Sequence, residues 1–285
     1  MKKVIVLVGP TGSGKTKYSI ELAKAINAEI INGDSVQIYQ ELNVGSAKIK
    51  EEEKDGVVHH LFDRATIKQD YTVFNYQNDV RNLIEQIDIP LIVGGTGFYI
   101  KAALYNYEFN KEEKTIDYSN YTNEQLYNKL VSLDPLIEID RNNRHRLIRA
   151  LTQAKHGTLR SKKRKKDEPL YDILTIYLDI DRKKLKERLY LRLDKQLEDG
   201  FIDEVKYIRQ QNVKLNMIGY RELDQYLDSI ITLEEAKENI IISSMRLAKR
   251  QKTWFKNQMS AHLFDPLKEN TSAEIIKLAK DFLKE

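Results

Sequence analysis

An apolar run, VIVLV at residues 4–8, leads directly into the octet GPTGSGKT at residues 9–16, and few folds accommodate such a junction. A continuous run of β-branched and aliphatic residues is typical of a strand buried on both faces of a parallel sheet. The octet matches the pattern GxxxxGK[ST], in which backbone N–H groups and the start of the next helix hold phosphate. We therefore expect an α/β protein with a phosphate-binding loop of the ATP-binding, P-loop type.

Each residue type in this loop contributes to phosphate binding. The lysine supplies a point charge and the threonine hydroxyl supplies a ligand for Mg²⁺, so Thr16 is the expected metal-binding residue. A kinase, a nucleotide switch or a diphosphate-releasing transferase could begin this way. The DxxG and NKxD motifs of guanine-nucleotide switches do not follow where they should, which argues against GTP. The expected phosphate-binding residues are Gly9, Pro10, Thr11, Gly12, Ser13, Gly14, Lys15 and Thr16.

Composition restricts the class of protein further. The chain has 285 residues, of which 41% are hydrophobic, so it can bury a sizeable core. It has no cysteine, which excludes disulfides, thiolate metal sites and a cysteine nucleophile, and a net charge of +4 permits an acidic partner such as RNA. The first apolar run is too short for a signal peptide, and no run approaches the length of a membrane span. We expect a soluble, cytoplasmic protein that needs no membrane.

Strands and helices alternate along most of the chain, which predicts a P-loop NTPase-like, doubly wound parallel sheet. Between residues 110 and 167 the pattern changes to polar helices, so we expect a helical insertion domain there, with the core formed by residues 1–109 and 168–285. The expected strands are 4–8, 28–32, 91–93, 171–180 and 262–264. The expected helices are 15–26, 73–87, 182–198, 201–211, 219–228, 232–257 and one from 272, with 123–131 and 143–155 in the insertion.

Two further polar residues are expected at the same edge of the sheet as the loop. Asp34 follows the second predicted strand, and Thr96, in the run Gly94-Gly95-Thr96, follows another. Ligands of open parallel sheets bind at the carboxyl ends of the strands, so these side chains are expected to converge on the phosphate site. The alternative for Asp34 is a structural one, as a helix cap or a turn residue.

Several basic residues have two possible roles from pattern alone. Arg188 and Arg192 lie one turn apart on a predicted helix and could reach a diphosphate, but for Arg192 the pattern alone favours a solvated salt bridge with a neighbouring acid. The segment KRQKTWFK at 249–256 suits RNA binding, and it equally suits a core tryptophan with basic neighbours. The run KKRKK at 162–166 is either a solvated tip or a contact for phosphate charge.

Taken together, the motifs resemble those of the tRNA dimethylallyltransferases, or tRNA isopentenyltransferases, of the bacterial type without a zinc finger. The resemblance runs from residue 4 to about residue 257, and its specificity comes from the order and spacing of many short stretches. These are GPTGSGKT, GDSVQIYQELNVGSAK at 33–48, HHLFD at 59–63, PLIVGGTGFYIKA at 90–102, DP at 134–135, NRHRLIRAL at 143–151, GFIDEV at 200–205, IGYRELDQYL at 218–227 and LAKRQKTWF at 247–255.

The resemblance implies a reaction and a partner for it. Members move the dimethylallyl group of dimethylallyl diphosphate to N6 of the adenosine just 3′ of the anticodon, position 37 of tRNA, and release diphosphate. The implied catalytic residues are Asp34, which accepts the N6 proton, Thr96 beside the adenosine, and Arg192, which holds diphosphate with Lys15 and Mg²⁺. The implied partners are the anticodon stem-loop of tRNA and dimethylallyl diphosphate, with no obligate protein partner.

The target base must leave its stack to be modified, so the enzyme must hold the anticodon arm. The resemblance also implies which residues bind the tRNA. His145 and Met245 depart from the residues that members commonly have, and so does GSAKI at 45–49. The implied residues are Asp34, Ser35, Val36, Gln37, His145, Arg146, Leu147, Ile148, Arg149, Asn216, Gly219, Tyr220, Arg221, Lys249, Arg250, Gln251 and Trp254.

Three other functions compete with this one. A small-molecule or nucleoside kinase also combines a phosphate loop with a carboxylate and arginines, and would consume ATP. A dimethylallyltransferase acting on a free adenine nucleotide would have little use for the insertion. A non-catalytic RNA-binding module would leave the loop, Asp34 and Thr96 without a role.

Overall fold

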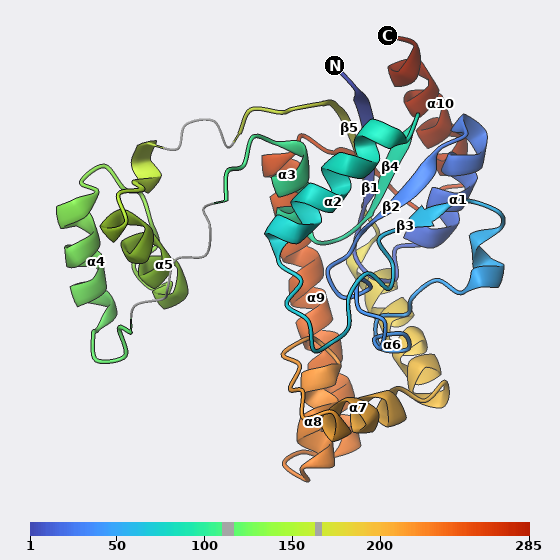
Figure 1. Ribbon diagram of the computed structural model, residues 1–285. Helices are drawn as coiled ribbons and strands as arrows, with labels where there is room; N and C mark the ends of the chain where they lie inside the picture. Colours follow the sequence, from blue (N-terminus) through green and yellow to red (C-terminus); the bar gives the residue numbers. More distant parts are fainter. Residues whose placement is uncertain (110–116, 163–166) are drawn as a thin grey trace. The chain divides into compact units, whose positions relative to one another are not determined.

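The centre of the fold is a parallel sheet whose strands follow the order β3-β2-β4-β1-β5-β6 (Figure 1). The computed structural model describes residues 1–109, 117–162 and 167–285. Within them every strand pair is parallel, which confirms the predicted α/β class. The strands are β1 (Lys3–Val8), β2 (Glu29–Gly33), β3 (His59–His60), β4 (Pro90–Gly94), β5 (Asp172–Leu178) and β6 (His262–Phe264).

Strand β1 lies between β4 and β5, and its residues Val4–Val8 are completely buried, as a run without polar positions requires. Alternate residues such as Ile5 and Leu7 pack against helices α1 (Lys15–Ile26) and α10 (Thr271–Lys284) in one cluster. Helices α2 (Val73–Gln86) and α3 (Gly97–Leu104) pack together on the other side of the sheet. The sheet is therefore covered on both faces, and its carboxyl edge carries the loops that matter for function.

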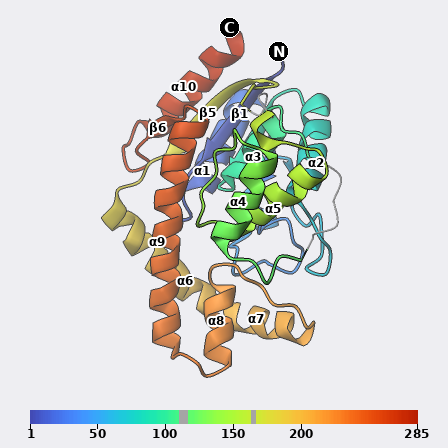
Figure 2. The same cartoon turned by 90° about the vertical axis from the view of Figure 1, so that its left-hand side faces the viewer.

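Four helices, which lie between β5 and β6 in the sequence, extend the core past the carboxyl ends of the strands. They are α6 (Arg182–Glu198), α7 (Phe201–Gln210), α8 (Tyr220–Leu227) and α9 (Leu233–Gln258). Leu185, Leu189 and Leu193 of α6 lie in the apolar cluster that these helices share. A capping box begins α9, because the Thr232 side chain accepts from the amide of Glu235 and the Glu235 side chain accepts from the amide of Thr232. Figure 2 shows α9 running from this helical end of the molecule up to the sheet.

The structure contains elements that the sequence pattern did not predict. Strand β3 has only two residues at the edge of the sheet, too few to show a periodic pattern. Helix α3 has the sequence GFYIKAAL, and its last five residues, Lys101 included, are all buried, so it lacks the polar face by which a surface helix is recognised. Two short 3₁₀ turns, at Glu51–Lys54 and Arg160–Lys162, also fall in segments without a clear pattern.

Residues Tyr105–Pro169 form a second compact unit, separate from the unit of Met1–Leu104 with Leu170–Glu285. Its helices α4 (Asn123–Leu133) and α5 (Arg144–Lys155) enclose a small core that includes Leu126, Leu130 and Leu147. The amide of Asn106 donates to the carbonyl oxygen of Glu168, where the chain enters and leaves the unit. The basic run singled out at 162–166 lies, from residue 163 on, outside the described residues. In the described part of the chain, no helix is both long and apolar enough to cross a membrane.

Candidate active site

A cavity of about 260 Å³ opens at the carboxyl edge of the sheet, where the loops after β1 and β2 meet helix α6. One part of its wall is polar and basic, and another is apolar. The polar part includes Thr11, Gly12, Gly14, Lys15, Thr16, Asp34, Gln37, Arg188 and Arg192, whereas the apolar part includes Ile30, Ala47, Ile49, Phe62 and Val93. The cavity therefore brings the phosphate-binding loop, the predicted carboxylate and the predicted arginine together.

The phosphate-binding loop joins β1 to α1 as the sequence predicts. Gly14, with a φ of 93°, turns the chain into the helix, which begins at Lys15. The Lys15 ammonium donates to the carbonyl oxygens of Gly9 and Pro10 at 2.8 and 3.0 Å. Burial lowers the pKa of Lys15 to about 8, and the Asp34 carboxylate offsets part of this shift. An anion that enters the cavity would therefore meet the buried positive charge of Lys15, which protein groups offset only in part.

Asp34 directly follows β2 and forms a turn, with no helix after it. One carboxylate oxygen accepts a hydrogen bond of 2.9 Å from the amide of Val36, and the Asp34 amide donates to the side-chain oxygen of Asn32. The fully buried Asn32 also donates to the carbonyl oxygen of Leu61, so the turn is fixed to the next loop. Of the two structural alternatives for Asp34, the turn is thus the one found, and its side chain still lines the cavity.

Thr96 is fixed to the same turn as Asp34. Its hydroxyl accepts from the amide of Ser35 at 3.0 Å and donates to the Ser35 hydroxyl at 3.2 Å. The amides of Gly95 and Thr96 both donate to the carbonyl oxygen of Gly33. Gly94 is paired with Gly33, and a Cβ on Gly94 would lie 2.1 Å from the Gly33 carbonyl carbon, so no larger residue fits. Asp34 and Thr96 are consequently carried by two turns in direct backbone contact.

Arg192 does not form the salt bridge that its helical neighbours suggest. Its guanidinium donates to the carbonyl oxygen of Ser46 at 3.1 Å, whereas Glu187 pairs with Lys184 and Asp194 pairs with Lys237. Burial lowers the pKa of Arg192, and the charge of Asp34 opposes that effect. Arg188, one turn earlier, donates to the carbonyl oxygen of Gly12 in the phosphate-binding loop. Both arginines therefore face the cavity from α6.

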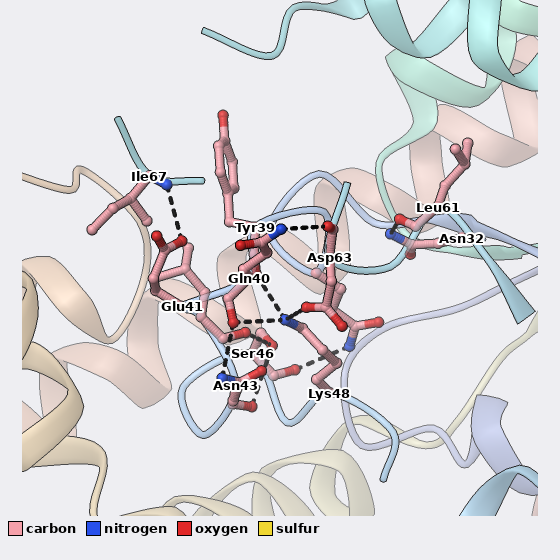
Figure 3. A network of polar contacts seen from close by, with 12 residues as sticks. Asn32, Tyr39, Gln40, Glu41, Asn43, Ser46, Lys48, Leu61, Asp63 and Ile67 are labelled. Carbon is pink, nitrogen blue, oxygen red and sulfur yellow. Dashed lines mark hydrogen bonds and ion pairs between the residues drawn. The ribbon is translucent and has the colours of Figure 1, made fainter. Parts of the chain in front are cut away.

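The loop after Asp34 is held by a network of polar contacts that sequence reasoning missed (Figure 3). The ammonium of Lys48 is buried in this loop, where it donates to the Tyr39 carbonyl oxygen at 2.7 Å and pairs with Asp63 at 2.6 Å. The Ser46 hydroxyl donates to the carbonyl oxygen of Leu42 at 2.6 Å. A lysine within a polar motif is expected to be exposed, and nothing in the sequence distinguishes Lys48 from an ordinary surface lysine.

Helix α7 fastens the same loop from the other side through Glu204. Its carboxylate accepts from the amides of Asn43, Val44 and Gly45 at 2.7–3.0 Å and from the Tyr220 hydroxyl at 2.8 Å. Glu204 belongs to the motif GFIDEV, and this motif is the feature of the sequence that could have drawn attention to it. The motif does not reveal which groups the Glu204 carboxylate binds.

The apolar wall of the cavity was also not predicted. Phe62 and His59 lie edge to face at 5.7 Å between ring centres, beside Ile30 and Val93. His59 contacts the carbonyl oxygen of Val57 through Nδ1, and burial lowers its pKa, which favours the neutral ring. His60 pairs with Glu29. Both histidines thus have protein partners, and the described residues contain no cluster of His, Asp and Glu that could hold a metal alone.

The residues expected to bind tRNA divide into exposed and packed ones. Exposed side chains are His145, Arg146, Arg149, Asn216, Arg221, Lys249 and Arg250. Leu147 is fully buried in the core of the helical unit, and Tyr220 is buried with its hydroxyl on Glu204. Partly buried positions are Ile148, Gln251, Trp254 and the turn Ser35, Val36 and Gln37, while Gly219 is buried.

Comparison with known proteins gives a consistent result. The family model described as IPP transferase matches residues 37–258. The chain is 52% identical to a tRNA dimethylallyltransferase of Acholeplasma laidlawii, over 99% of both chains, and 41% identical to that of Bacillus subtilis, over 92% of this chain and 90% of the other. A tRNA isopentenylpyrophosphate transferase structure from Bacillus halodurans superposes with a TM-score of 0.78 at 34% identity, covering 100% of this chain and 97% of that one. A eukaryotic dimethylallyltransferase acting on tRNA gives 0.88 at 28% identity, covering 100% and 80%.

Proposed function

This chain belongs to the IPP transferase family of tRNA dimethylallyltransferases, and we propose that its cavity transfers a dimethylallyl group from dimethylallyl diphosphate to N6 of the tRNA adenosine just 3′ of the anticodon. The observation that supports this proposal most directly is the convergence of Lys15, Asp34 and Arg192 on one cavity that also has an apolar wall. An anionic leaving group needs the two cations, the proton needs the carboxylate, and a prenyl tail needs the apolar wall. Because tRNA is processed inside the cell, the enzyme would act in the cytoplasm.

The diphosphate would bind at the phosphate-binding loop, with Lys15 and Arg192 on either side. Breaking the allylic C–O bond leaves negative charge on the bridging oxygen, and cations and N–H groups that are already in place stabilise that charge. Arg188 is close enough to the loop to add a third positive charge. The loop would thus hold a leaving group, and no phosphoryl group is transferred.

Mg²⁺ fits this site only together with the diphosphate. Thr16 lines the cavity, and its hydroxyl is the ligand that the sequence pattern of the loop assigns to the metal. The described residues provide no cluster of His, Asp and Glu to complete the coordination. Mg²⁺ commonly takes one or two protein ligands and completes its octahedron with phosphate oxygens and water. When bound, it would supply additional positive charge for the leaving diphosphate.

Asp34 would act on the other reactant. The exocyclic N6 of adenine is a weak nucleophile because its lone pair is delocalised into the ring. As the N6–C bond forms and the C–O bond breaks, one N6 proton passes to the Asp34 carboxylate, and such assistance contributes roughly 10²–10⁴-fold. Thr96, fixed beside Asp34 through Ser35, would contact the adenosine and orient it for this step.

The RNA would be held by exposed basic residues. In the helical unit these are His145, Arg146 and Arg149 on α5, and we propose that this unit, residues 110–167 by the sequence pattern, binds the anticodon arm. In the core unit they are Arg221, Lys249 and Arg250 on α8 and α9. Contacts of arginine and lysine with phosphate account for most nucleic-acid affinity and weaken with salt.

One assay separates this function from its competitors. The protein is incubated with Mg²⁺ and labelled dimethylallyl diphosphate, in parallel with unmodified tRNA, AMP or ATP, and the nucleosides are analysed by mass spectrometry. We expect label on adenosine 3′ of the anticodon in tRNA alone. Label on AMP would indicate a free-nucleotide enzyme, ATP consumption a kinase, and tRNA binding without transfer a non-catalytic module.

A further inference from the structure

The turn that carries Thr96 is held between two parts of the core unit. On one side it bonds to Gly33 of β2, as described above. On the other side it contacts helix α9, whose Gln251 side chain donates to the carbonyl oxygen of Gly95 at 2.9 Å. The Trp254 ring lies against the α-carbon of Gly97, close enough that a Cβ on Gly97 would be 2.4 Å from the ring. Neither Gly95 nor Gly97 has a positive φ, so the missing side chain leaves room for α9 and serves no unusual backbone conformation.

These contacts come from one face of α9. Gln251, Trp254 and Gln258 follow the i, i+3, i+7 spacing that aligns side chains along a helix. Gln258 accepts from the buried ammonium of Lys101 on α3 at 2.8 Å, so the helix contacts both the turn before α3 and α3 itself. Phe255, fully buried, anchors the same stretch against Tyr177 of β5. The inner face of α9 is thus fixed to the sheet, while Lys249 and Arg250 on its other side are exposed.

We propose that Gln251 and Trp254 are positioning residues, which hold the Gly94–Gly97 turn so that Thr96 stays in register with Asp34, in place of the tRNA contacts expected for them from the sequence. This inference rests on the proposed function and adds to it the means by which the acceptor side of the site is kept rigid. A displacement of about 1 Å at a reacting group can reduce a rate by about 10²-fold. The residues that set this turn should therefore affect turnover more than tRNA affinity.

The closeness of Trp254 to Gly97 permits a direct test by a double-mutant cycle. Gly97→Ala places a methyl group where the ring lies and should displace the turn or the helix, whereas Trp254→Ala removes the ring and creates the space that this methyl group needs. If the two residues act through their contact, adding Gly97→Ala to Trp254→Ala should lower kcat by less than about threefold, although Gly97→Ala alone lowers it by tenfold or more. If the effects of the two substitutions on kcat instead multiplied in the double variant, the proposal would be wrong.

Two further variants distinguish positioning from RNA contact. Gln251→Met keeps the size of the side chain and removes its donor, so we expect kcat at saturating tRNA to fall about tenfold while the Kd for tRNA, measured by filter binding without donor substrate, changes by less than twofold. Lys249→Met changes an exposed residue in the same helical turn of α9, and it should instead raise the Kd for tRNA. A Gln251→Met variant with normal kcat and a tenfold weaker Kd would overturn the proposal. Ile242→Ala, about 13 Å away from Gln251 along the same helix at 1.5 Å per residue, is the matched control.

A readout without activity keeps this test separate from the proposed function. Hydrogen exchange of peptides covering residues 94–104 should be faster in Gln251→Met and Trp254→Ala than in the wild type, and unchanged in Ile242→Ala. Unaltered exchange in both variants would show that α9 does not hold the turn. If the wild-type protein failed to prenylate tRNA, the proposed function would be wrong. The exchange result would still decide whether α9 holds the Gly94–Gly97 turn.

Discussion

The guanidinium of Arg192 donates to the carbonyl oxygen of Ser46 across 146 positions of the sequence. Ser46 is in the loop that Glu204 fastens through three backbone amides. In the described chain Arg192 has no ion pair, so a neutral backbone oxygen orients it and its charge remains available to an anion. The position of the proposed diphosphate-binding arginine therefore depends on an uncharged carbonyl group of this loop.

Replacing Arg192 by alanine should lower kcat/KM for dimethylallyl diphosphate by about 10²–10³-fold, because a preorganised donor to the leaving group is lost. Arg192→Lys should recover only part of this, since lysine lacks the planar fork that suits phosphate. Steady-state kinetics with varied donor substrate measures the effect. Lys195→Ala, an exposed position on the same helix, should behave as the wild type; an equal loss there would point to damage of α6.

Asp34→Asn should reduce kcat by about 10²–10⁴-fold, because the amide cannot take the N6 proton. The asparagine oxygen can still accept from the Val36 amide, so the turn should survive and the Kd for tRNA should stay within about threefold. Single-turnover transfer assays and filter binding give the two values. Near-normal turnover by this variant would refute the role of Asp34 as the base.

The pKa of Lys15 predicts a pH dependence. Since burial lowers this pKa to about 8 from an ordinary value of 10.5, the free enzyme loses the Lys15 proton, and with it the positive charge, as the pH rises through 8. We therefore expect kcat/KM for dimethylallyl diphosphate, which reports the free enzyme, to decline above about pH 8. Lys15→Arg should be less active at pH 7 but nearly flat between pH 7 and 9.5. A flat wild-type profile over that range would argue against this assignment.

Glu204→Gln should lower the free energy of unfolding by about 1–3 kcal/mol, because one amide N–H then faces backbone N–H groups that had a carboxylate oxygen. Urea denaturation followed by circular dichroism measures this change. The neighbouring Asp203→Asn removes only an exposed pair with Lys206 and should cost less than about 1 kcal/mol. Equal effects of the two substitutions would mean that Glu204 does not anchor the loop.

The sequence predicts most clearly those parts of the site that directly follow a buried strand. The phosphate-binding loop and Asp34 could be placed because an apolar run fixes where each strand ends, and parallel strands bring these ends to one edge. Helix α3 could not be predicted, since GFYIKAAL is buried almost all round and has no polar face. The partner of Arg192 was also beyond reach, because helical spacing reveals neighbours on the same helix and not a carbonyl group on a distant loop.

Trp254 illustrates a different limit. From pattern alone a tryptophan among basic residues fits either RNA stacking or the core. The structure places its ring against Gly97, 157 positions earlier, where the absence of a side chain makes room for it. Pattern analysis of one segment cannot detect such complementarity, which depends on two segments meeting in space.

The backbone contact between Gly33 and Gly94 leaves no room for a side chain on Gly94, where β4 ends. Substitution at Gly94 therefore offers no gradual way to move Asp34, the proposed base, relative to Thr96. Divergence toward another acceptor nucleotide would then have to change the cavity walls and the surfaces proposed to bind RNA, while Asp34 and Thr96 keep their relative position.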